Sequence, residues 1–238
     1  MKERINTLLS SQRVFLICWA LLIIVMSVAL VVVPKQELHL ALNINAHTTA
    51  LDSFFKYFTK TAEYLPYIIP IILLFYKFSW AIFAALGQLG ATLTTQILKH
   101  IVNAPRPKIF FETNYPDLIP QLHWVQGVNM HNWFSFPSGH TTAFFALFFL
   151  ISILICDNKK SISHKWLILI QILCFLLAAL GGYSRIYLSQ HFTADVLAGT
   201  IVGVLLTTLF YVIPWPWNQA WADKSLLKSV RKPRPSCE

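Results

Sequence analysis

The stretch Val14–Val33 reads VFLICWALLIIVMSVALVVV, twenty residues interrupted by a single polar side chain, Ser27. A run of about 20 apolar residues is long enough to cross the hydrocarbon core of a bilayer as one α-helix. Basic residues precede the run, as they do in a secretory signal peptide, but the apolar stretch is too long for one and no small-residue cleavage site follows it. We therefore interpret Val14–Val33 as a retained membrane span.

The rest of the chain is similarly apolar. Hydrophobic residues make up 56% of the 238 residues and charged residues only 12%, whereas soluble globular domains carry about 25% charged residues. Five further apolar runs follow the first: Tyr64–Tyr76, Phe78–Leu98, Thr141–Cys156, Trp166–Tyr183 and Val196–Ile213. Because Tyr64–Tyr76 is short for a full crossing, we expect that span to start earlier, near Thr59, with Glu63 close to the interface. The sequence predicts an all-α polytopic membrane protein, a bundle of six transmembrane helices.

The basic residues of the loops predict the orientation of this bundle. With the N-terminus in the cytoplasm, most of the 19 Lys and Arg residues lie on the cytoplasmic side. We expect a cytoplasmic N-terminus (1–13), a six-span domain (14–213) and a basic cytoplasmic tail (214–238). The basic stretch Lys224–Arg234 suits a topological anchor, with binding of anionic lipid headgroups as a second interpretation. The net charge of +9 is split among loops and both termini, so we expect no nucleic-acid partner.

Three blocks of polar residues stand at the ends of the predicted spans. They are Lys99-HIVNAP-Arg106-Pro107, then Pro137-Ser138-Gly139-His140, then Ser184-Arg185 followed after five residues by His191 and after three more by Asp195. The first two blocks share the loop between the third and fourth spans, and the third block joins the fifth and sixth spans. All three therefore face one compartment, which the predicted orientation makes the non-cytoplasmic side.

The residue types in these blocks suit a phosphate group. Arginine binds phosphate oxygens with paired hydrogen bonds and lysine adds a point charge. Pro137-Ser138-Gly139 is typical of a helix start, where free backbone N–H groups favour an anion, and Gly139 allows that anion to approach closely. Histidine can act as nucleophile or general acid. His191 and Asp195 lie on one helical face if the sixth helix begins at or before His191.

In order, spacing and residue type, the three blocks match the signature of the type-2 phosphatidic acid phosphatase family, which the chain resembles over about residues 54–213. The resemblance implies a lipid phosphatase with a phosphohistidine intermediate on His191, oriented by Asp195, and with His140 as general acid. It also implies phosphate binding by Lys99, Arg106, Ser138, Gly139 and Arg185. For Ser184, contact with phosphate and a role in ending a helix stay equal alternatives. The family needs no metal, and the chain shows no His, Cys and Asp cluster with metal-ligand spacing, so we expect no cofactor.

The partner implied by the resemblance is a membrane lipid that carries a phosphate. Lipid A phosphate and undecaprenyl diphosphate are the substrates we favour, in a cell (inner) membrane with the active site facing the periplasm or the cell exterior. Alternatives are a phosphatidylglycerol phosphate phosphatase, a lipid phosphotransferase, or a non-enzymatic transporter of anionic lipids. A transporter more often shows repeats and broken helices near mid-membrane. A catalytically inactive binding protein is a further class, which the presence of both histidines and Asp195 disfavours.

Three features outside the blocks are open to more than one interpretation. The loop Lys108–Phe136 is long and aromatic, which suits either a folded cap that selects the lipid or an interfacial loop anchored by its aromatic side chains. Gly199-x-x-x-Gly203 suits packing within the bundle better than a dimer face. The tryptophans after the last span suit an interfacial belt; they are Trp215, Trp217 and Trp221. We assign no role to histidines such as His100, His123, His131 and His164, which match no block.

Overall fold

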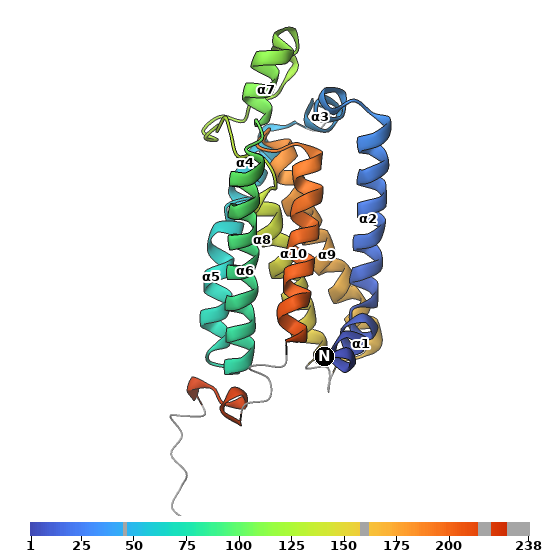
Figure 1. Cartoon of the computed structure of the whole chain (residues 1–238), viewed down its shortest axis with the longest axis vertical. Coiled ribbons are helices and arrows are strands. Elements are labelled where there is room, and N and C mark those ends of the chain that lie inside the picture. The colour runs from blue at the N-terminus through green and yellow to red at the C-terminus, as the bar shows by residue number, and fades with distance from the viewer. Residues whose placement is uncertain (45–46, 158–161, 214–219, 228–238) are drawn as a thin grey trace, which may run out of the picture.

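The structure is a computed structural model that describes residues 1–44, 47–157, 162–213 and 220–227. These residues form helices, turns and irregular segments, and none of them is in a strand. The long helices lie side by side along the longest axis of the molecule (Figure 1). The prediction of an all-α fold is therefore confirmed. Trp215 and Trp217, and most of the predicted basic tail, lie outside the described residues.

Five of the described helices are long and apolar enough to cross a membrane, so the chain is a multi-pass membrane protein. They are α2 (Arg13–Val32), α6 (Phe78–Val102), α8 (Gly139–Asp157), α9 (His164–Tyr187) and α10 (Thr193–Val212). The sixth predicted span corresponds to α5 (Thr61–Leu73), a shorter helix that packs beside α6 and follows α4 (Thr49–Phe58) after a short turn. The predicted number of six spans is therefore approximate.

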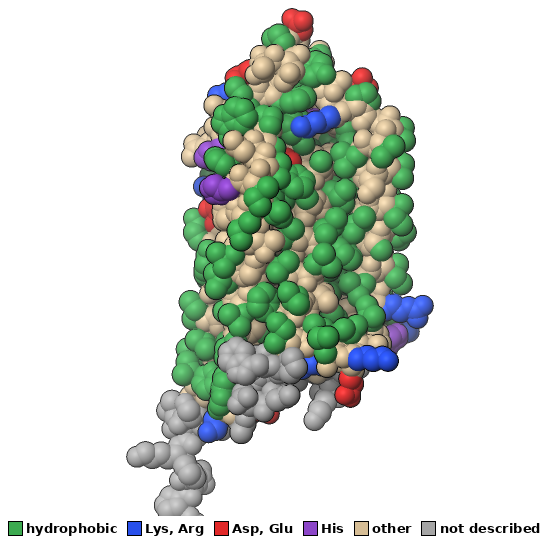
Figure 2. Space-filling model, viewed as in Figure 1, with side chains coloured by type: hydrophobic (Ala, Val, Ile, Leu, Met, Phe, Trp, Pro, Cys, Tyr) green, Lys and Arg blue, Asp and Glu red, His purple; other side chains and the backbone are tan. Residues whose placement is uncertain are grey.

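Helix α8 forms the centre of the bundle. It packs against α5, α6, α9 and α10, and large side chains such as Phe145 and Phe149 are fully buried along it. Helix α2 lies at the periphery, where Leu21, Val25 and Val28 are exposed. Figure 2 shows hydrophobic side chains over the middle of the visible face, with most charged side chains toward its ends. Apolar side chains that face outward are what contact with lipid tails requires.

Two glycines allow α10 to approach α8 closely. A Cβ atom on Gly199 would lie 2.7 Å from the carbonyl oxygen of Ser138, and one on Gly203 would lie 2.7 Å from that of Thr142. Both distances are far shorter than a normal contact, so any side chain here would push the two helices apart. The Gly199-x-x-x-Gly203 pattern therefore serves packing within the bundle, as the sequence analysis favoured.

The two ends of the bundle carry different elements. The N-terminus and α1 (Lys2–Ser11) lie at one end, whereas α3 (Lys35–Ile44), α4 and α7 (Pro107–Asn114) lie at the other (Figure 1). A short helix η3 (Ala220–Asp223) follows the last span. The long loop holds α7 and a second short helix, η1 (Pro116–Gln121), and its Phe111 and Leu122 are buried against Phe192. The loop therefore folds onto the end of the bundle, as expected for a cap.

Candidate active site

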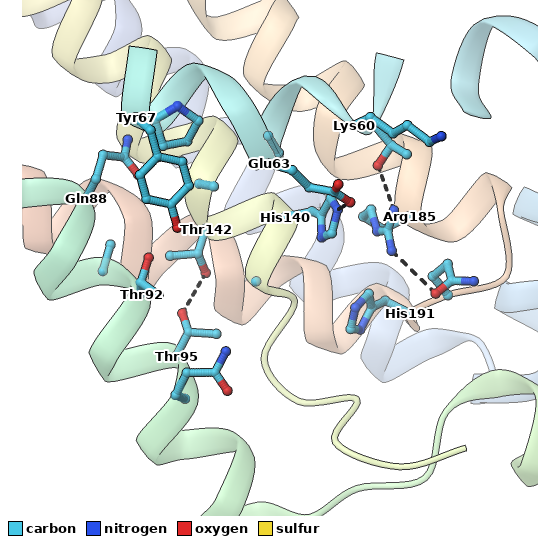
Figure 3. Close-up of a pocket in the computed structure, with 18 of the residues that line it drawn as sticks. Lys60, Glu63, Tyr67, Gln88, Thr92, Thr95, His140, Thr142, Arg185 and His191 are labelled. Atoms are coloured by element: carbon cyan, nitrogen blue, oxygen red, sulfur yellow. Dashed lines mark hydrogen bonds and ion pairs between the residues drawn. The ribbon is translucent and has the colours of Figure 1, made fainter. Parts of the chain in front are cut away.

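A cavity of about 960 Å³ lies between α5, α6, α8, the end of α9 and the long loop. Six of the residues singled out from the three sequence blocks line it: Lys99, Arg106, Gly139, His140, Arg185 and His191. The structure thus brings residues from all three blocks to one site. From there the cavity continues along α5 and α6, where apolar side chains such as Pro66, Ile71 and Leu89 line it together with a few polar ones, Gln88, Thr92 and Thr95 among them (Figure 3).

Two arginines of the cavity share one neutral acceptor. Arg106 Nη1 donates to Gln190 Oε1 at 3.1 Å, and Arg185 Nη2 donates to the same oxygen at 3.4 Å. Arg185 Nη1 donates to Thr59 Oγ1 at 2.6 Å, while its buried Nε has no hydrogen-bond partner among the described residues. In the part of the chain that the structure describes, no carboxylate pairs with Lys99, Arg106 or Arg185. The cavity is thus suited to an anion that carries more than one charge.

Backbone geometry after α6 positions the first two cations. Lys99 stands in the last turn of α6, where its buried Nζ donates to the carbonyl oxygen of Phe134. The helix then ends at Asn103, which adopts the left-handed conformation with φ of 42° that commonly terminates helices. Arg106 follows, with its backbone N–H bonded to Asn132 O at 2.8 Å and its Nε to Trp133 O at 3.0 Å. The long loop therefore holds both side chains in place.

His191 is buried in the short turn between α9 and α10, with 2% of its surface exposed. Its Nδ1 lies 3.5 Å from Asp195 Oδ2, and the same oxygen accepts hydrogen bonds from Ser135 Oγ and, at 2.9 Å, from Phe192 N. Helix α10 begins at Thr193, so the premise that it begins at or before His191 was wrong. The contact forms because Asp195, in the first turn of α10, reaches back toward the preceding turn.

The surroundings of His191 keep its imidazole neutral. Burial is the largest cause that lowers its pKa, to about 3, and the positive charges of Arg106 and Arg185 act in the same direction. The hydrogen bond and negative charge of Asp195 oppose this shift but do not reverse it. At neutral pH the ring therefore keeps a lone pair on one nitrogen. Because Nδ1 faces Asp195, Nε2 is the nitrogen left for other chemistry.

His140 lies in the first turn of α8, and its Nε2 is 3.1 Å from Glu63 Oε1 on α5. Figure 3 shows Glu63, His140, Arg185 and His191 gathered in the same part of the cavity. Sequence reasoning placed Glu63 near the interface but gave it no role, although an acidic residue beside an apolar run is costly and indicates a function. Gln190 and Thr59 were also missed, and no sequence signal distinguishes them.

Two serines of the blocks do not line the cavity. Ser138 is fully buried, and its Oγ accepts a hydrogen bond from Thr141 Oγ1 at 2.8 Å at the start of α8. Ser184 Oγ donates to Gly181 O at 2.6 Å, a hydrogen bond within α9. Gly139 does line the cavity, and a Cβ atom built on it would lie 3.9 Å from Lys99 Cε. The start of α8 is therefore next to a cation.

Known proteins resemble this chain in sequence and in fold. The family profile described as PAP2 superfamily matches residues 78–219. A lipid A 4'-phosphatase from Porphyromonas gingivalis is 29% identical over 80% of this chain and 77% of its own length. Phosphatidylglycerophosphatase B from Bacillus subtilis is 29% identical over 59% of this chain and 64% of its own. The crystal structure of Aquifex aeolicus LpxE superposes with a TM-score of 0.58 and 26% identity, covering 74% of this chain and 93% of that one.

Some of these relatives are much longer than this chain. The match covers 49% of a probable lipid phosphate phosphatase 4 from Arabidopsis thaliana and 58% of lipid phosphate phosphatase 2 from the same plant. The matched region nonetheless takes in all three blocks and every helix from α6 to α10. By its sequence profile and its fold, the chain belongs to the PAP2 superfamily.

Proposed function

We propose that this protein is an integral membrane lipid phosphatase that hydrolyses a lipid phosphate monoester or diphosphate. One observation carries the proposal: a single cavity gathers the two histidines and the three cations of the sequence blocks, and it continues past apolar side chains of α5 and α6. Among the described residues, no carboxylate forms an ion pair with any of these three cations. The polar end suits a phosphorylated headgroup and the apolar end suits its hydrocarbon tail. The cations can bind the phosphate, and the histidines can act as nucleophile and general acid, so the proposed reaction needs no metal.

In this proposal, the cations around Gln190 bind the phosphate. Lys99, Arg106 and Arg185 would surround the phosphate oxygens, with the unpartnered Nε of Arg185 as an additional donor. The backbone N–H groups at the start of α8, at Gly139, favour the same negative charge. We assign Ser138 to this helix start as its cap. Preorganised donors of this kind stabilise charge that develops during a reaction.

His191 is the proposed nucleophile. Its Nε2 attacks phosphorus, so that an N–P bond forms while the bond from phosphorus to the lipid oxygen breaks. The lipid oxygen leaves with the electron pair and takes a proton from His140, whose protonated form the Glu63 carboxylate stabilises at 3.1 Å. Asp195 stabilises the positive charge that develops on the His191 ring. His140, now neutral, then removes a proton from water, which attacks the phosphohistidine and releases phosphate.

Lipid A phosphate and undecaprenyl diphosphate are the substrates that we propose first. Relatives named lipid A 4'-phosphatase match up to 80% of this chain. A relative from Saccharomyces cerevisiae is named dolichyldiphosphatase, which supports a lipid diphosphate. The relative named phosphatidylglycerophosphatase B supports phosphatidylglycerol phosphate as the alternative. The last turn of α6 and the first turns of α8 and α10, which carry block residues, lie at the end of the bundle opposite the N-terminus (Figure 1). A cytoplasmic N-terminus would therefore orient the site toward the periplasm or the cell exterior.

The test is phosphate release by the full chain in detergent, with lipid A, undecaprenyl diphosphate and phosphatidylglycerol phosphate supplied side by side. We expect release from at least one lipid and its loss in His191→Ala, with the variant still eluting as a folded protein. A phosphorylated protein that is stable to base and labile to acid should form in wild type only. If His191→Ala releases phosphate as fast as wild type, His191 is not the nucleophile. If folded wild type releases phosphate from none of the three lipids, the proposal of a lipid phosphatase is wrong.

A further inference from the structure

A second cluster of polar side chains lies outside the cavity, where the long loop meets the bundle. His47 precedes α4, Asp52 lies in the first turn of α4, and His123 follows η1 in the loop. His47 Nδ1 is 2.8 Å from Asp52 Oδ1, and His123 Nε2 is 2.8 Å from Asp52 Oδ2. One ligand atom from each residue lies within 4.8 Å of the others. None of the three residues lines the cavity described above.

We propose that His47, Asp52 and His123 bind a divalent transition metal ion of the zinc class, which fastens the loop to the bundle. Two imidazole nitrogens and one carboxylate oxygen are a donor set that zinc accepts, with its fourth position open to water. Metal ligands are commonly oriented by outer hydrogen bonds. Here Tyr187 Oη donates to Asp52 Oδ1 at 2.6 Å and orients the carboxylate.

The arrangement of the two rings allows them to share one ion with Asp52. The rings of His47 and His123 stack with centroids 3.6 Å apart, and both turn a nitrogen toward the same carboxylate. Two protonated rings would place like charges face to face at that distance, so the stacked pair is expected to be neutral. Each neutral ring can turn either an N–H or a lone pair toward this point, and a metal ion binds the form with the lone pairs.

Such an ion would stabilise a wall of the cavity. His123 already contacts α3, because its backbone N–H donates a hydrogen bond to Asn43 Oδ1 at 3.0 Å. A few residues further along the loop, Val125 and Val128 pack against Phe55, Tyr187 and Leu188. The loop then contributes Val128 and Asn129 to the cavity lining, and Asn129 O accepts a hydrogen bond from Gln190 Nε2 at 2.8 Å. The metal would therefore support the residues that hold Gln190 without touching the reacting atoms.

The experiment measures metal binding by the full chain, purified in detergent with a tag that contains no histidine. The protein is stripped with a chelator, dialysed against zinc chloride and then against buffer, and bound zinc is counted by mass spectrometry. We expect about one zinc ion per chain and an upward shift of the thermal unfolding midpoint on adding zinc. Asp52→Asn and His123→Ala should lose both effects. His164→Ala, which removes an exposed histidine at the start of α9, is the matched control and should keep both.

Two results overturn the proposal. Wild type that binds no zinc is one, and variants that bind as much zinc as wild type are the other. If Asp52→Asn or His123→Ala fails to fold, wild type loaded with cobalt(II) decides instead, because nitrogen and oxygen ligands in a low-coordinate site produce strong visible absorption. Its absence overturns the proposal. Binding is measured without any lipid, so its failure leaves the proposed phosphatase activity untouched, and loss of activity in His191→Ala leaves the metal site untouched.

Discussion

Replacing Asp195 by asparagine tests the catalytic proposal most directly. Its Oδ2 lies 3.5 Å from Nδ1 of His191, and both side chains are buried. Attack by Nε2 on phosphorus leaves positive charge on the imidazole, which the carboxylate stabilises and an amide of nearly the same shape does not. We therefore expect Asp195→Asn to slow the chemical step while leaving substrate binding to the cations unchanged.

The structure sets the size of this effect. Two unit charges 3.5 Å apart attract with about 5 kcal/mol at an effective dielectric constant of about 20. Since each 1.4 kcal/mol or so changes a rate about tenfold, a full charge on the ring corresponds to a loss of about 10³ or slightly more. The charge is only partly developed when the N–P bond is half formed, and the amide oxygen still accepts hydrogen bonds. We expect kcat to fall about 10²-fold.

The assay is the initial rate of phosphate release across a range of lipid concentrations, which separates kcat from KM. Asp117→Asn, the same substitution at an exposed position of the long loop, is the matched control and should match wild type. Thermal unfolding of each variant shows whether the fold is retained. A kcat for Asp195→Asn within about threefold of wild type, in a folded protein, refutes the reasoning that Asp195 stabilises charge on His191.

Three further predictions concern other parts of the molecule. Glu63→Gln removes the carboxylate beside His140, so we expect kcat for phosphate release to fall about tenfold, as for loss of a charged hydrogen bond; an equal rate contradicts this role. The pKa of His191 is about 3 in the folded protein and 6.5 ordinarily. Between these pH values the unfolded chain therefore binds a proton at His191 that the folded protein does not bind, which favours unfolding. The unfolding midpoint should therefore fall as pH drops from 6.5 toward 3, less steeply in His191→Gln; equal slopes contradict this. Gly203→Ala should lower the free energy of unfolding by about 1–3 kcal/mol, because its Cβ meets Thr142 O at 2.7 Å, whereas Gly87→Ala, with open space, should not; equal unfolding midpoints contradict the packing argument.

The membrane helices could be predicted from the sequence, because the length and apolar composition of a run are enough to favour its insertion into lipid, whatever its neighbours are. The run starting at Phe78 and the run ending at Tyr183 correspond to α6 and α9, with ends shifted by a few residues. The short helices α3, α4 and α7 were not predicted, because their apolar side chains are matched to neighbours at the end of the bundle opposite the N-terminus (Figure 1). Phe111 of α7, for example, is buried against Phe192 at the start of α10.

The sequence by itself determined the membrane class and predicted that the three blocks meet on one side. It also singled out five residues that the structure places around one cavity: Lys99, Arg106, His140, Arg185 and His191. The order of the apolar runs along the chain is enough to place the blocks on one side of the membrane. The types of the block residues are enough to predict that they bind phosphate.

Only the tertiary structure decided which side chains complete the site. The contact of Glu63 with His140, the bridge of Gln190 between two arginines and the cluster of His47 with His123 each join segments that are far apart in the chain or turned by a loop. Likewise, Gly139 and His140 line the cavity while the neighbouring Ser138 is buried, and this difference depends on how α8 and α10 pack. Contacts of this kind depend on the relative positions of helices and loops, and no spacing along the chain encodes a distance of 3 Å or so between two of them.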